Sequence, residues 1–174
     1  IERAWIGPLA PATQQIGWIA LRWQGRPLVI VVTHLKSPNY AASRSELQAL
    51  ATQGADAQSA GNRGRAQEVN ALLLQPALAG LPGDLVVMGD FNGAPWSRVY
   101  RQLVAATGLD GRRQFRLSDP AWLPAALRAP SDHIRGRGAI AVTQFRTGPA
   151  LGSDHLPVLA ELVKAMAAAG FAAG

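Results

Sequence analysis

Residues 85–92 read LVVMGDFN, in which an apolar run leads directly into a short polar end. A continuous apolar run of this kind is typical of a strand that is covered on both faces. A second run, LVIVV at residues 28–32, has the same character and leads into THLKS at residues 33–37. Asp90 and Asn92 are two residues apart, so on an extended chain both side chains would point to one face. The sequence therefore predicts buried strands whose ends carry polar side chains that could bind a ligand or take part in catalysis.

The segments around these two runs predict the remaining elements of an α/β fold. The alternating stretch 16–23 predicts a hairpin partner for the strand at 28–32. Helical spacing predicts helices over 43–53 and 65–78, and Ser97 is placed to cap a further helix that ends at Gly108. Residues 111–130 are interpreted as a long surface loop, and 139–145 and 155–163 as two final strands. The Ala/Gly segment 165–174 is interpreted as a frayed tail after a single domain over residues 1–164.

Composition excludes several classes of protein. The chain is 48% hydrophobic, which argues against disorder, and it contains no cysteine, which excludes disulfides, thiol nucleophiles and zinc–thiolate sites. No run of the sequence approaches the roughly 18 apolar residues of a membrane-spanning helix. The net charge of +6 suits a polyanionic partner such as nucleic acid. The positive residues are mostly arginine rather than lysine, however, and a GC-rich genome produces the same bias.

All three histidines of the sequence lie beside predicted strand ends. His34 follows the run at 28–32, while His133 lies in SDHI at 131–134 and His155 in GSDHLPV at 152–158. A single Asp-His pair is usually a hydrogen-bonding device in a loop, and GDFN by itself is usually a turn. The occurrence of all these motifs at strand ends instead indicates one common site.

Taken together, these motifs resemble those of the endonuclease/exonuclease/phosphatase superfamily, the deoxyribonuclease I-like fold. The matching motifs are THLKS at 33–37, Arg65 with Glu68 on a predicted helix, GDFN at 89–92, SDHI at 131–134 and GSDHLPV at 152–158. The resemblance implies an α/β (α+β) four-layer sandwich, in which two mostly antiparallel mixed sheets are flanked by helices. It also implies divalent-metal-dependent hydrolysis of a phosphoester by in-line attack of water.

The resemblance gives a role to each matching residue of the catalytic set. His155 is the histidine that activates the water or binds the scissile phosphate, and Asp132 holds its imidazole in the productive tautomer. Asp90 orients the nucleophile and Asn92 donates to a phosphate oxygen. His34 lies near the leaving group and is the candidate general acid.

The metal side of the site departs from the family pattern. The resemblance places Asp154 near the metal, and carboxylate ligands suit Mg²⁺ or Mn²⁺. The family's upstream Asn and Gln-Glu ligands are missing, and the context of Glu2 does not match theirs. We therefore expect residues 1–164 to be the C-terminal two-thirds of the family domain and to bind the metal weakly. We also expect uncovered sheet surface to cause self-association or to retain an N-terminal fragment.

Three further residues match the family only as secondary candidates, either for phosphate contacts or for packing and solvent exposure; they are Lys36, Arg65 and His133.

Three interpretations of the function remain open. The leading one is a metal-dependent phosphodiesterase or nuclease, and the others are a phosphomonoesterase of the same superfamily and an inactive module that binds phosphorylated ligands. The location is open between the cytoplasm of a bacterium and a membrane-tethered position outside it.

Overall fold

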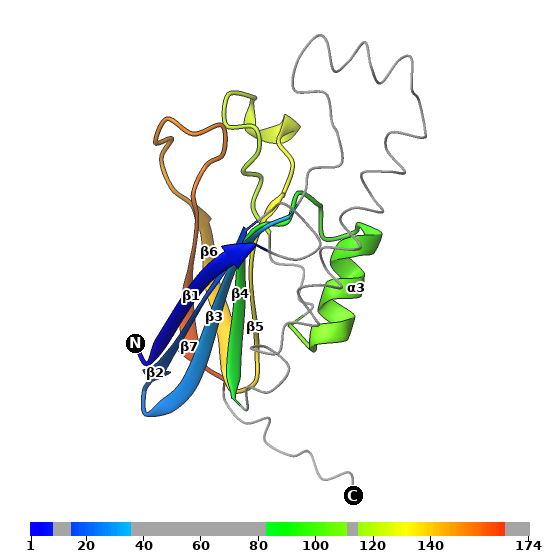
Figure 1. Ribbon diagram of the computed structural model, residues 1–174. Helices are drawn as coiled ribbons and strands as arrows, with labels where there is room; N and C mark the ends of the chain where they lie inside the picture. Colours follow the sequence, from blue (N-terminus) through cyan, green and yellow to red (C-terminus); the bar gives the residue numbers. More distant parts are fainter. Residues whose placement is uncertain (9–14, 36–82, 111–114, 166–174) are drawn as a thin grey trace, which may run out of the picture.

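The computed structural model describes residues 1–8, 15–35, 83–110 and 115–165, which form two sheets and a helix (Figure 1). The larger sheet has the strand order β1-β2-β3-β4-β5, with β3 and β4 parallel and all other neighbours antiparallel. The smaller sheet pairs β6 with β7 in antiparallel fashion. The strands span Arg3–Pro8, Gln15–Trp23, Arg26–His34, Asp84–Asp90, Asp132–Arg137, Ile140–Thr147 and Val158–Lys164. The helices expected over 43–53 and 65–78 lie outside the described residues.

The two apolar runs form the parallel pair β3 and β4 of the larger sheet, and both are covered on two faces as predicted, except at Val32, which is 45% exposed. Val29 and Val31 lie in the same buried cluster as Leu103 of the helix α3 (Arg98–Thr107). The alternate residues Leu28 and Val86 pack instead with Ile140 of β6. In Figure 1 α3 accordingly lies beside one face of the larger sheet and β6 and β7 beside the other. These layers confirm the predicted sandwich class. None of the described helices is long and apolar enough to cross a membrane.

The predicted hairpin and the predicted caps of α3 are also present. Gln24 and Gly25 join β2 to β3 with φ angles of 49° and 78°, the left-handed backbone of a two-residue hairpin turn. The side chain of Ser97 accepts a hydrogen bond from the Tyr100 amide at 3.2 Å, and α3 ends at Gly108 in the left-handed conformation.

Three elements differ from the sequence expectation. The short strands β1 and β5 were not predicted as strands, and β7 begins at Val158 rather than at residue 155. The interpretation of 111–130 as a surface loop holds for the exposed residues 124–127, but the segment has more structure than expected. Ser118 is fully buried, Asp119 forms a β-bridge with Ala129, and a 3₁₀ turn occupies Ala125–Leu127.

Gly89, the residue before the polar end of β4, is required by the close approach of β3. Its φ is +133°, and a Cβ there would collide with the main-chain carbonyl of Thr33 on the parallel neighbour. We expect Gly89→Ala to destabilise the fold by about 3 kcal/mol or more, because both the backbone angle and the collision oppose a side chain. The matched control is Gly108→Ala, where φ is +65° but nothing lies within 4 Å, and about 1 kcal/mol is expected. Urea unfolding of both variants measures this, and equal effects would contradict it.

Candidate active site

The parallel pairing of β3 and β4 brings the polar ends of three strands into one row. His34 is the register partner of Asp90, and Asp90 is the register partner of Asp132 on β5. The imidazole Nε2 of His34 lies 3.4 Å from Oδ2 of Asp90, although the His34 side chain is largely exposed. Three residues that are far apart in the sequence are therefore adjacent because of sheet register alone.

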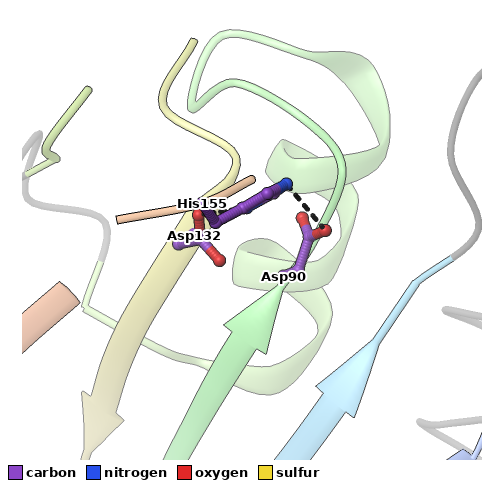
Figure 2. A group of neighbouring side chains, drawn as sticks. All are labelled: Asp90, Asp132 and His155. Atoms are coloured by element: carbon purple, nitrogen blue, oxygen red, sulfur yellow. Dashed lines mark hydrogen bonds and ion pairs between the residues drawn. The ribbon is translucent and has the colours of Figure 1, made fainter. Parts of the chain in front are cut away.

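His155 reaches this row from the loop between β6 and β7. Figure 2 shows its ring between Asp132 and Asp90. Its Nδ1 donates to Oδ2 of Asp132 at 2.8 Å, and its Nε2 lies 4.0 Å from Oδ2 of Asp90. The same Nε2 lies 3.2 Å from Oδ1 of Asp119, a residue that was not predicted because no motif or periodicity marks its loop.

Asp132 is itself held in place by two hydroxyl groups. Ser118 Oγ donates to its Oδ2 at 2.5 Å, and Ser131 Oγ donates to the same oxygen at 3.3 Å. Both serines are buried. The two hydroxyls therefore hold the same carboxylate oxygen that orients His155, which is the arrangement of a histidine–carboxylate pair with a supporting shell.

Three carboxylates lie close together in this cluster, and the pKa values of Asp90, Asp119 and His155 are all raised. The pKa of Asp90 is raised to about 6. Burial is the largest cause and the charge of Asp132 acts in the same direction, while the backbone hydrogen bond from Asn92 and the charges of His155 and His34 oppose them. Burial also raises the pKa of Asp119. Burial lowers the pKa of His155, but the hydrogen bond and charge of Asp132 and the charges of Asp119 and Asp90 outweigh it, so that its pKa is raised. A cluster with these shifts attracts protons and cations.

Asn92 does not share a face of an extended strand with Asp90, and that part of the prediction was wrong. Its φ is +46°, so the chain turns directly after β4. The main-chain nitrogen of Asn92 donates to Oδ1 of Asp90 at 2.7 Å. Its side-chain Nδ2 donates to Oδ2 of Asp90 at 3.0 Å and to the Leu35 carbonyl at 2.8 Å. Asn92 therefore holds the Asp90 carboxylate and ties the end of β4 to the end of β3.

The remaining candidates lie at the margin of the cluster or outside it. The Asp154 side chain is exposed and accepts a hydrogen bond from Ser153 Oγ at 3.3 Å. It lies close enough to Asp119 for its charge to raise the pKa of that carboxyl. Lys36 and Arg65 lie outside the described residues.

His133 points away from the cluster and into the core. Its side chain is 1% exposed, and its ring centroid lies 4.6 Å from that of Tyr100 and 5.1 Å from that of Phe91. Its Nε2 donates to the Gly93 carbonyl at 2.8 Å. Burial lowers the pKa of His133 to about 4, so the ring is neutral at physiological pH. This is the packing position that the sequence left open for it.

The buried His133 is expected to make stability depend on pH. The unfolded chain takes up a proton at this histidine near pH 6.5, whereas the folded chain does so only near pH 4, so stability falls as the pH is lowered between these values. From about pH 7 to about pH 5 we expect the wild type to lose about 2 kcal/mol more than His133→Phe. Because Asp90 titrates in both proteins, the difference between their urea midpoints isolates His133. A difference that is independent of pH would refute this assignment.

Three side chains offer a possible metal-binding group. One ligand atom each from Asp90, Asp132 and His155 lies within 4.8 Å of the others. The chemistry of the donors suits a divalent cation at Asp90, a half-buried carboxylate that lies close to the charge of Asp132. It suits one less well at Asp132, whose Oδ2 already accepts three hydrogen bonds.

Comparison with known proteins finds one family and a consistent set of structures. Residues 9–155 match the Endonuclease/Exonuclease/phosphatase family. No curated protein matches the sequence. An endonuclease/exonuclease/phosphatase from Bacteroides vulgatus has a TM-score of 0.64 at 17% identity, covering 94% of this chain and 66% of that chain. The human Nocturnin catalytic domain with bound sulfate has a TM-score of 0.59 at 20% identity, covering 93% and 58%.

A mannosyl-6-phosphatase from Bacteroides thetaiotaomicron has a TM-score of 0.57 at 15% identity, covering 94% of this chain and 66% of that chain. At these identities the likeness shows the fold. The chain thus spans between 58% and 66% of the length of these solved structures.

Proposed function

The chain belongs to the endonuclease/exonuclease/phosphatase family, and from this premise we propose that it hydrolyses phosphoesters with the cluster of His155, Asp132 and Asp90. The observation that carries the proposal is the 2.8 Å hydrogen bond from Nδ1 of His155 to Asp132, at a point where three strand ends meet. It fixes the tautomer of the ring and directs Nε2 toward Asp119 and Asp90.

In this proposal His155 Nε2 takes the proton of the attacking water or binds the scissile phosphate. Asp132 orients the ring and stabilises the imidazolium that forms. Asp90, held by Asn92 on both carboxylate oxygens, orients the water. His34, exposed and adjacent to Asp90, protonates the leaving oxygen. Each role corresponds to a group whose position the sheet register or a hydrogen bond determines.

A divalent cation completes the proposal. Asp90 would hold it, with Asp154 reaching it directly or through water, and Mg²⁺ and Mn²⁺ are the cations that carboxylates of this kind favour. When bound, the cation stabilises the charge that develops on the phosphoryl oxygens. Because the chain spans about two-thirds of the matched structures, we propose that residues outside it supply the remaining ligands and that this chain alone binds the metal weakly.

The proposed substrate class is the phosphodiester backbone of nucleic acid, which the net charge of +6 supports. Hydrolysis of supercoiled plasmid and of bis(4-nitrophenyl) phosphate is measured in Mn²⁺ across a salt series. For nucleic acid we expect the apparent affinity for plasmid to fall at least about tenfold between low and moderate salt, while the small ester changes little. Equal salt dependence would count against nucleic acid and favour a small phosphoester, including a phosphomonoester.

A further inference from the structure

Asp119 occupies the ring nitrogen of His155 that the proposed reaction requires. Its Oδ1 lies 3.2 Å from Nε2, while Nδ1 on the other side of the ring donates to Asp132 at 2.8 Å. While this contact persists, the Asp119 carboxylate lies where an incoming oxygen would meet Nε2. In this arrangement His155 is paired with two carboxylates, and Nε2 becomes available only when Asp119 withdraws.

The position of Asp119 is fixed by the main chain on two sides. Its amide donates to the Ala129 carbonyl at 3.1 Å, and its own carbonyl accepts from the Ala129 amide. The residues beside it are joined to the loop that carries His155, because Leu156 donates to the Ser118 carbonyl at 3.0 Å and Ala121 donates to the Asp154 carbonyl at 2.6 Å. The backbones that carry Asp119 and His155 are therefore held together, and only the Asp119 side chain is left to move.

The chemistry of a carboxylate at this position resembles that of a phosphoryl group. Both present an anionic oxygen that accepts a charge-assisted hydrogen bond from an imidazolium. Both cannot occupy one N–H at the same time, and the negative charge of Asp119 repels an approaching phosphoryl group at this distance. The Asp119 side chain is 29% exposed, so it has a path toward solvent when it is displaced.

We propose that Asp119 is a displaceable internal ligand of His155, which holds Nε2 until a phosphoryl oxygen takes its place. This inference rests on the proposed function, because it takes the incoming group to be a phosphoryl group. Substrate binding then competes with a contact inside the protein. The side chain of Asp119 sets the affinity of the site without taking part in bond formation.

The test is a double-mutant cycle read by binding of inorganic phosphate to the 174-residue chain in chelated, metal-free buffer. Asp119→Asn keeps the shape of the side chain and removes its charge. We expect it to bind phosphate about tenfold more tightly than the wild type, since one like-charge contact and one competing ion-pair contact with Nε2 are removed. In the His155→Ala background the same substitution should give a clearly smaller gain, because only the like-charge contact is then removed. Glu161→Gln, an exposed carboxylate on β7 outside the cluster, is the matched control and should have no effect.

Four results would overturn the proposal. These are unchanged or weaker binding in Asp119→Asn, an undiminished gain in His155→Ala, an equal gain in Glu161→Gln, and no phosphate binding by any variant at millimolar concentrations. As a second readout, phosphate added to the wild type should shift the ¹⁵N resonance of His155 Nε2, and an unmoved resonance would also overturn it. Hydrolysis by the same proteins is measured separately. Absent hydrolysis by the version extended upstream of Ile1 at saturating metal, with an intact cycle, would refute the proposed function and leave the role of Asp119 standing.

Discussion

Replacing His155 with alanine is expected to lower kcat/KM for phosphodiester hydrolysis by about 10³-fold or more. The imidazole is the group at the centre of the cluster, and Asp132, Asp119 and Asp90 would lose their common partner. No other described imidazole can replace it, because His133 is buried with its Nε2 on Gly93 and His34 lies on the far side of Asp90.

The measurement is steady-state hydrolysis of bis(4-nitrophenyl) phosphate, with a thermal melt to show that the variant is folded. His133→Phe is the matched control because it also removes one histidine ring, but from the core. It should retain activity within about tenfold at neutral pH wherever it remains folded. Activity of His155→Ala within tenfold of the wild type would contradict the role of His155.

Replacing Asp132 with asparagine is expected to have the second largest effect, a loss of about 10² to 10³-fold. The amide retains the shape but can present an N–H to Nδ1, which disfavours the tautomer that leaves Nε2 as the base. The pH profile should change as well. Asp132 is a main cause of the raised pKa of His155, so removing its charge lowers that pKa and moves the acid limb of kcat/KM to lower pH.

The control for Asp132 is Ser118→Ala, which removes one of the hydroxyl groups that hold the carboxylate. It should cost about tenfold or less and leave the acid limb where it is in the wild type. An Asp132→Asn variant whose rate falls while its acid limb stays in place would show that Asp132 has a purely structural role.

The central part of the fold could be predicted because its signals are local. The runs at 28–32 and 85–88 are apolar on every residue, and the structure buries alternate residues against α3 and against β6. The turn at Gln24 and Gly25 and the caps at Ser97 and Gly108 also depend on neighbouring residues only. β1 and β5 were missed because they are six residues long and carry glycine or charged residues within them.

The geometry of the site depends on long-range contacts. The family resemblance grouped His34, Asp90 and Asp132 in one site, and strand register is what places them in one row. Asp119 reaches His155 only because its loop is joined to Ala129 and to the segment after His155, and no local pattern encodes such a join. The turn at Asn92, which GDFN alone favours, was set aside for an extended chain, and the positive φ that it needs is uncommon at a non-glycine residue.

The most direct test of the central claim is a divalent-metal titration of bis(4-nitrophenyl) phosphate hydrolysis. It compares this chain, a version extended upstream of Ile1, and the His155→Ala form of each. We predict hydrolysis in the extended protein that appears with Mg²⁺ or Mn²⁺, disappears with chelator and is lost in His155→Ala, with the present chain weaker at every metal concentration. Hydrolysis that survives either chelation or the loss of His155, or no hydrolysis by the extended protein at saturating metal, would contradict the account.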